Sequence, residues 1–156
     1  IVPVPAPRLC QFSSSAEAST LSVERSDKGI TQQSFAIFKK IAQADSAMSP
    51  ELQSRVFEVH PEVCFWAAAG RQQLSHRKSK EAGFDERRAI LERVFGGVDI
   101  PTRRKAAGLF VGVKPDDLLD AIVAAWTALR HAQGICERVP ESQELDARGL
   151  RMEMVF

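Results

Sequence analysis

Apolar residues recur at helical spacing along most of the chain, and the clearest pattern lies between Pro115 and about Gln133. There Asp116 and Asp117 precede a continuous apolar stripe made of Leu119, Ile122, Val123, Trp126 and Leu129. Such a stripe predicts an amphipathic helix that packs one face on a core.

Shorter patterns with capping signals predict further helices. Hydroxyl residues before apolar runs, proline at a first helical position and glycine after the last apolar residue mark their ends. The expected helices cover about residues 16–25, 31–44, 61–70, 84–95 and 101–108, with one or two turns after Ser49-Pro50. The polar residues 72–80 predict a loop.

Strand patterns are few. Residues 55–60 alternate in the manner of a strand, which places Glu58 and His60 on the same face. Residues 152–156 form a second candidate strand at the end of the chain. The sequence therefore predicts a helix-rich α/β fold with few strands.

The length of 156 residues, with 44% hydrophobic and 26% charged content, predicts a single domain or domain fragment over residues 1–156. Three of the first seven residues are prolines, so residues 1–12 are expected to form an extended arm. Such a start also fits the remnant of a longer protein. Residues 134–156 are expected to form an irregular tail.

Charge and cysteine content narrow the class of protein. With a net charge of +1 and a pI near 7.9, the chain has no strong overall positive charge that would by itself indicate binding to nucleic acid or to an anionic membrane. The three cysteines, Cys10, Cys64 and Cys136, lack the paired spacing of a zinc site. We expect reduced thiols in a cytoplasmic protein. No apolar stretch approaches the roughly 20 residues that cross a bilayer, so no membrane partner is expected.

Carboxylates gather at the start of the long helix. Asp116 fits an N-cap, and Asp117 fits a favourable charge at the positive end of a helix. Asp120 lies one turn after both of them, where like charges repel. A divalent cation would relieve that repulsion, so Asp117 and Asp120 are candidate metal ligands as well as candidate structural residues.

A second group of candidates lies at 58–62. Glu58 either faces solvent, paired with Arg55 or His60, or points into a site that keeps it ionised. His60 fits a metal ligand, a general base or a residue bound to the backbone. Glu62 lies in the first turn of the next helix, where a negative charge is favoured without any function. We rank Glu58 first and Glu62 last.

The stretch from 71 to 105 contains ten basic and five acidic residues, a local balance of +5. The residues expected to contact phosphates are Arg77, Lys78, Lys80 and Arg87. Solvated helix faces give similar counts, so nucleic-acid binding is one of two interpretations. The chain has no tyrosine, and no aromatic residue lies among the basic residues of the polar loop 72–80, which argues against a stacking platform for single strands.

Several motifs occur together along the chain. They are Gln32-Gln33-Ser34-Phe35, Glu58-Val-His-Pro-Glu62 with Phe65-Trp66, Ser79-Lys80 ahead of Gly83 and Arg87, and Asp116-Asp117-Leu-Leu-Asp120-Ala121 with Ala124-Ala125-Trp126. This combination resembles the domain of unknown function 429 family of predicted RNase H-like nucleases, over nearly the whole chain.

The resemblance implies the C-terminal part of an RNase H-like fold. It also implies a nuclease that hydrolyses DNA or RNA with Mg²⁺ or Mn²⁺. Asp117 and Asp120 would be metal ligands, Glu58 the strand carboxylate and His60 a further catalytic residue.

The sequence departs from the family at two places, because it lacks the aspartates of an opening strand and of a later strand. Two-metal hydrolysis would then lack ligands that it needs, and uncovered sheet edges would favour a homodimer. Two functions stay open: a metal-dependent nuclease, or a non-catalytic interaction or nucleic-acid-binding module.

Overall fold

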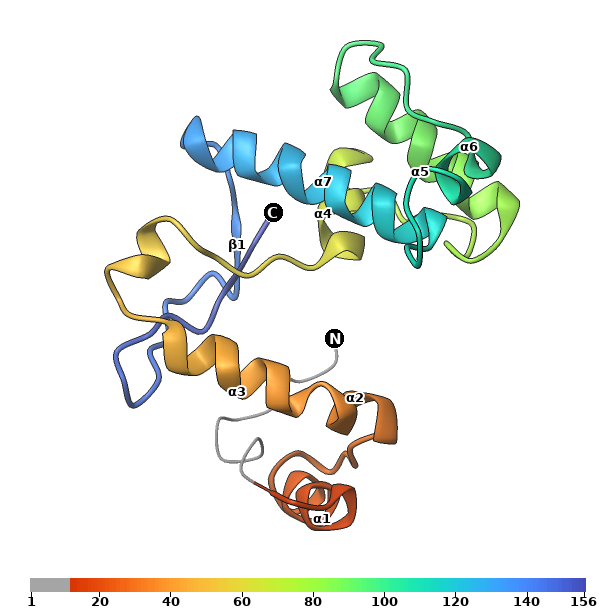
Figure 1. Ribbon diagram of the computed structural model, residues 1–156. Coiled ribbons are helices and arrows are strands. Elements are labelled where there is room, and N and C mark those ends of the chain that lie inside the picture. Colours follow the sequence, from red (N-terminus) through yellow and green to blue (C-terminus); the bar gives the residue numbers. More distant parts are fainter. Residues whose placement is uncertain (1–11) are drawn as a thin grey trace. The chain divides into compact units, whose positions relative to one another are not determined.

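The computed structural model describes residues 12–156, apart from the side chains of Arg25 and Ser26 (Figure 1). The expected arm over residues 1–12 lies outside this range, except for Phe12. The chain divides into two compact units, with the boundary between Gln53 and Ser54. The second unit carries every candidate site residue.

The first unit contains three helices, α1 (Ser15–Ser26), α2 (Gln32–Ala36) and α3 (Phe38–Ala47). The hydroxyl of Ser14 accepts the N–H of Glu17 and caps α1, as the serine run predicted. The helix expected over 31–44 is interrupted at Ile37, whose N–H donates to Ser34. This hydrogen bond spans three residues instead of the four of an α-helix, and α2 ends there before α3 begins. Buried Ala18 and Phe38 form the small core of the unit.

The short helical segment expected after Ser49-Pro50 is a 3₁₀ turn, η2 (Leu52–Ser54). The hydroxyl of Ser49 accepts the N–H of Leu52 at 3.2 Å and caps this turn.

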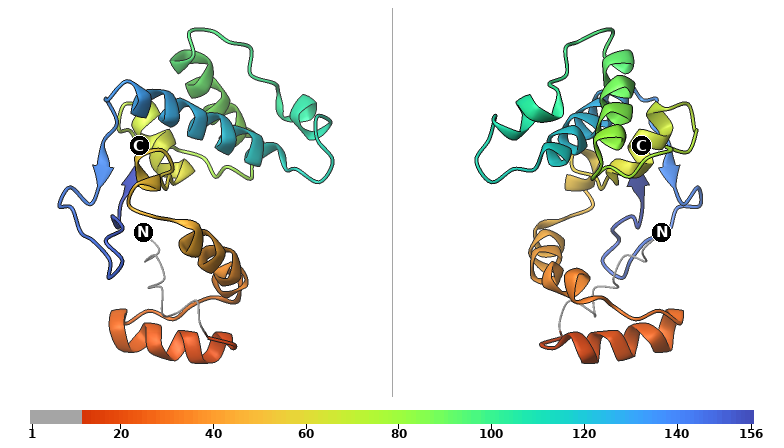
Figure 2. Two further views of the ribbon diagram at one scale, coloured as in Figure 1. Left: turned by 60° about the vertical axis from the view of Figure 1, so that its left-hand side comes forward. Right: turned by 90° about the vertical axis from the view of Figure 1, so that its right-hand side faces the viewer.

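Four helices build the second unit: α4 (Pro61–Ala68), α5 (Glu81–Val94), α6 (Arg103–Ala107) and α7 (Pro115–Ala132). Both views of Figure 2 show α7 lying against α4 and α5, and it also contacts α6. The core between them consists of Cys64, Phe65, Ala68, Phe84, Ile90, Leu91, Ile100, Ala106, Leu119, Val123 and Phe156. The long helix expected from the apolar stripe is therefore the central element of the unit.

The stripe on α7 differs from the expectation at its C-terminal end. Leu119 and Val123 are buried, as expected, but Leu129 is 54% exposed. Thr127 is fully buried instead, since it lies one turn after Val123 on the same face. Its main-chain carbonyl accepts the thiol of Cys136 at 3.3 Å. Both described cysteines, Cys64 and Cys136, are free thiols.

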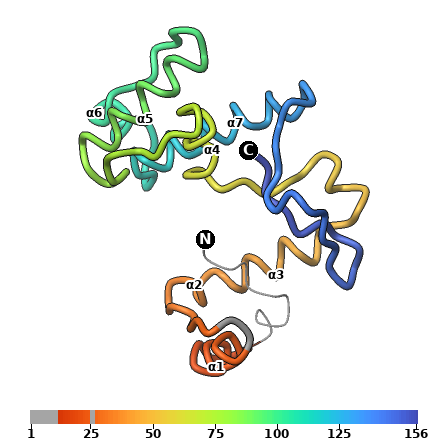
Figure 3. The backbone as a smooth tube through the Cα atoms, turned by 180° about the vertical axis from the view of Figure 1, so that it is seen from behind, coloured from red at the N-terminus to blue at the C-terminus, as the bar shows by residue number. Residues whose placement is uncertain are grey.

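The strand prediction for residues 55–60 is wrong. This segment joins no sheet, because Arg55 lies in a turn and residues 56–60 have no regular secondary structure. The described strands are β1 (Arg138–Val139) and β2 (Met154–Val155), paired antiparallel. The N–H of Val155 donates to the carbonyl of Glu58 at 2.9 Å. In Figure 3 the C-terminal segment crosses the stretch that precedes α4. The expected terminal strand is present as β2, so the tail over 134–156 is only partly irregular.

Among residues 12–156 the fold has seven α-helices and two short strands, which confirms the helix-rich character. No helix in this described range is long and apolar enough to cross a membrane.

Candidate functional site

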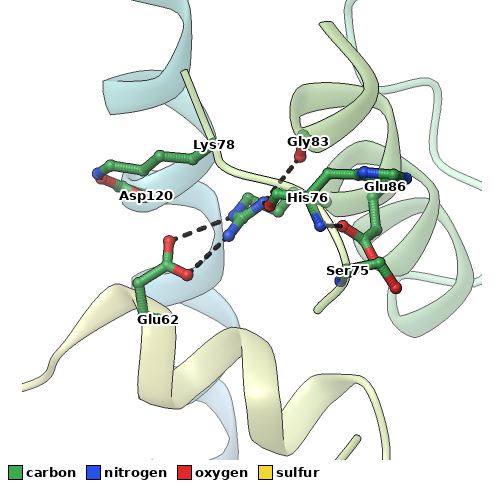
Figure 4. A network of polar contacts seen from close by, with 8 residues as sticks. Glu62, Ser75, His76, Lys78, Gly83, Glu86 and Asp120 are labelled. Carbon is green, nitrogen blue, oxygen red and sulfur yellow. Dashed lines mark hydrogen bonds and ion pairs between the residues drawn. The ribbon is translucent and has the colours of Figure 1, made fainter. Parts of the chain in front are cut away.

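A buried arginine organises the surface between α4 and α5. Arg87 is only 3% exposed, and its guanidinium donates to both carboxylate oxygens of Glu62, at 3.2 and 2.7 Å. Its third nitrogen donates to the carbonyls of His76 and Gly83, at 3.1 and 2.9 Å. Figure 4 shows Glu62, His76 and Gly83 around this network. Because a buried charge must be paired and hydrogen-bonded, Arg87 ties α4, α5 and the intervening loop together.

Residues 71–80, here called the basic loop, are also fixed by the first turns of α5. The carboxylate of Glu86 accepts the main-chain N–H groups of Ser75 and His76, at 2.8 and 3.0 Å (Figure 4). Burial acts to raise the pKa of Glu86, but these donors and neighbouring positive charge lower it below its usual value. Two side chains of α5 thus hold the loop at His76, and Glu86 also holds Ser75.

Gly83 permits this close approach. A Cβ atom at this position would lie 2.0 Å from the carbonyl oxygen of Arg77 and 2.5 Å from its carbonyl carbon. Contacts below 3.0 Å between such atoms essentially never occur. The basic loop therefore packs directly on the backbone of α5, and only glycine fits there.

An ion pair joins the basic loop to α7. Lys78 Nζ lies 2.7 Å from Asp120 Oδ2 (Figure 4), and the side chain of Asp120 is 18% exposed. This hydrogen bond raises the pKa of Lys78, against the effect of burial. The negative charges of Asp116 and Glu62 add to the rise. Asp120 therefore contacts the ammonium group of Lys78 directly, whereas Asp116 and Glu62 act on it only through their charge.

The other oxygen of Asp120, Oδ1, is buried and accepts no hydrogen bond. An unpaired buried acceptor carries a desolvation cost of about 1–3 kcal/mol. Asp120 is thus the predicted metal ligand that keeps an unused oxygen.

The remaining predicted ligands lie elsewhere. The carboxylate of Asp117 accepts the N–H of Lys114 at 3.3 Å, which is the capping contact at the start of α7. Glu58 is exposed as a residue, but desolvation of its carboxyl group raises its pKa, and the positive charge of His60 opposes this shift. His60 occupies the N-cap of α4 without a side-chain capping bond. Over residues 12–156, no group of three or more His, Cys, Asp and Glu side chains could hold a metal ion.

The direction of the segment before α4 explains why Glu58 and Asp120 do not meet. The ring of Phe57 stacks on His131, with 4.2 Å between centroids, near the C-terminal end of α7. Asp120 lies eleven residues earlier on α7, about 16 Å along the helix axis at 1.5 Å per residue. Glu62, after the turn into α4, is the acidic residue that reaches the Asp120 end.

The four predicted phosphate-binding residues fall into two classes. Arg87 is buried with its donors occupied, and Lys78 is paired with Asp120. Arg77 and Lys80 are exposed, and neither takes part in an ion pair within the described part of the chain. The basic loop therefore carries two cations, Arg77 and Lys80, without ion-pair partners among the described residues, on a backbone that α5 holds in place.

An open pocket of about 530 Å³ lies beside the basic loop. Its lining includes Trp66 from α4 together with residues 73–78 of the loop. The Arg71 guanidinium carbon lies 5.7 Å from the centroid of the Trp66 ring, and Phe156 packs edge-on at 5.9 Å. Sequence reasoning missed Trp66 and Glu86, and no local signal links either residue to this loop.

A family model described as "Protein of unknown function (DUF429)" matches residues 1–145. The chain belongs to this family. No curated protein and no solved structure matches the chain. Membership agrees with the motifs in the sequence, and the family's description assigns no activity.

Proposed function

We propose that this member of the DUF429 family is part of an RNase H-like nuclease domain and that its basic loop holds the phosphate backbone of a nucleic acid. One observation carries the proposal: the loop is fixed by Arg87, Glu86 and Gly83, and yet Arg77 and Lys80 are free at its surface. A loop that is already ordered loses little conformational entropy on binding, which favours higher affinity.

Charge neutralisation gives the expected size of the effect. Each phosphate contact contributes about 0.9 to the slope of log affinity against log salt for duplex DNA, and about 0.7 for single strands. Removal of both Arg77 and Lys80 should reduce that slope by about 1.4 to 1.8. Affinity at low salt should fall at least about tenfold, by the loss of two charge-assisted contacts.

The test is fluorescence anisotropy with a labelled oligonucleotide, single-stranded and duplex, at several salt concentrations. The variant is Arg77→Ala with Lys80→Ala. Its matched control is Arg104→Ala with Lys105→Ala, which removes the same charge from exposed positions on α6. A loss of affinity confined to the loop variant supports the proposal. Equal losses in both variants would assign binding to net charge, and no measurable binding by the unaltered chain would reject it.

Metal-dependent hydrolysis by the same domain is the second candidate. It is favoured by the unused Oδ1 of Asp120, a buried oxygen on the carboxylate that pairs with Lys78. The predicted ligands Glu58, Asp117 and Asp120 do not converge in the described residues, so they do not fit a two-metal site, and we derive no hydrolytic step from them.

A Mn²⁺ titration by calorimetry tests this candidate separately. If Asp120 contributes a ligand, Asp120→Asn should weaken Mn²⁺ binding about tenfold or more, because an amide replaces a carboxylate. Asp99→Asn is the matched control, since Asp99 is exposed in the loop before α6. If Asp120→Asn binds Mn²⁺ as the unaltered chain does, Asp120 is not a metal ligand. The non-catalytic nucleic-acid-binding module is then the function that remains.

A further inference from the structure

We infer that the pocket beside the basic loop receives an unpaired base of a single-stranded nucleic acid, with Trp66 as the stacking ring. The inference rests on the proposed function and narrows its substrate class. It goes against the sequence-based expectation that the basic loop has no aromatic partner, because the fold supplies one from α4.

The pocket is open and has room for a nucleotide base. Its volume of about 530 Å³ lies within the range of small-molecule sites, about 300–1,000 Å³. Trp66 lines it from α4, and Gln73, Ser75 and His76 line it from the basic loop. The side chains of these three loop residues carry hydrogen-bond donors and acceptors, which suit the polar edge of a base.

The indole of Trp66 is held in place before any ligand arrives. Arg71 lies over its ring and is itself paired with Glu137, while Phe156 packs against it edge-on. A ring that is already immobile loses little conformational entropy when a base stacks on it. Base stacking on aromatic side chains accepts any sequence, since every base has a π-face.

The charges around the pocket favour an anionic chain. Glu62 is the acidic residue of the lining, and its carboxylate is neutralised by Arg87. Lys78 and Arg77 also line the pocket, and Lys80 lies two residues beyond. The base would therefore enter beside Trp66 while the flanking phosphates lie on the exposed cations of the basic loop. In a duplex the faces of the bases are covered by their neighbours, so the arrangement selects single strands.

The two tryptophans of the chain provide a direct readout. In a Trp126→Phe protein, Trp66 is the remaining fluorophore, and an oligothymidylate about 12 nucleotides long, within the range of single-strand site sizes, should quench its emission saturably. In a Trp66→Phe protein, Trp126 reports instead and should not be quenched. A duplex of the same length should bind without quenching Trp66.

Anisotropy measurements on Trp66→Leu give the energetic test. Affinity for the single strand should fall about 5- to 150-fold, the loss that follows removal of one stacking partner. Affinity for the duplex should stay unchanged. Binding of both nucleic acids through Arg77 and Lys80 without quenching of Trp66 would overturn the inference and leave the proposed function standing. Absence of binding to either nucleic acid would overturn both.

Discussion

Replacement of Gly83 by alanine tests how the basic loop is held. At most positions within a helix this change stabilises a protein by up to about 1 kcal/mol, because glycine is a poor helix former. At Gly83 the added Cβ would lie 2.0 Å from the Arg77 carbonyl oxygen and 3.1 Å from that of His76. Both neighbours are main-chain atoms, so the loop itself must move.

The expected loss of stability in Gly83→Ala follows from the steric overlap and from the contacts that the loop would lose. Overpacking of this kind costs about 1–3 kcal/mol. Displacement of the loop also breaks the bond from Arg87 to His76, worth about 1.5–3 kcal/mol as a bond to a charged donor. After subtraction of a helix-propensity gain of about 1 kcal/mol, we expect Gly83→Ala to lower the free energy of unfolding by about 1.5–5 kcal/mol.

Urea unfolding followed by tryptophan fluorescence measures this change in the second unit, since Trp66 and Trp126 both lie there. Gly108→Ala is the matched control. A Cβ at Gly108 would lie 3.7 Å from the Lys105 carbonyl oxygen, an ordinary contact, so this variant should be neutral within about 0.5 kcal/mol. A Gly83→Ala protein as stable as the unaltered chain would refute the packing that we describe between the loop and α5.

Three further predictions concern the polar network. Arg87→Ala should lower the free energy of unfolding by about 3 kcal/mol, because it breaks a buried ion pair. The control Arg88→Ala breaks partly exposed pairs within α5 and should lower it by less than about 1 kcal/mol. Similar losses in both variants would contradict the organising role of Arg87. The pKa of Glu86 is lowered on folding, so its contribution to stability is present above the unfolded pKa of about 4.3 and is lost as the pH falls through the folded value. Glu86→Gln should thus be less stable than the unaltered chain at pH 7, with the two converging in urea titrations at acidic pH; a constant difference would argue against a charged carboxylate at the loop. In a double-mutant cycle, Lys78→Met and Asp120→Asn should show a coupling energy of about 1–2 kcal/mol, because Asp120 is mostly buried. Additive effects of the two substitutions would show that this ion pair does not contribute to stability.

The long central helix could be predicted from sequence because its signals are local. Its apolar spacing and the acidic residues of its first turn act within a few residues of one another. The segment over 55–60 shows the limit of that reasoning. Alternation predicts a strand, but a strand also needs a neighbouring strand to pair with, which a local pattern cannot supply. Here the contact is a single bond from Val155.

The site was less predictable because its contacts join distant residues. Lys78 and Asp120 are 42 positions apart, and Glu62 and Arg87 are 25 apart. Charge counting treats all basic residues alike, whereas the fold buries Arg87, neutralises Lys78 and leaves Arg77 free. The same packing determines which acidic residue comes near Asp120. Glu62 does so because the turn into α4 carries it there, and Glu58 stays near the other end of α7.

Binding at the basic loop can be located by mapping amide chemical-shift changes while an oligothymidylate is titrated into ¹⁵N-labelled protein. We expect the largest changes at residues 73–80 and at the indole N–H of Trp66, with little change at Arg104 and Lys105 on α6. The absence of shifts at the basic loop, or changes centred on α6, would contradict this binding site.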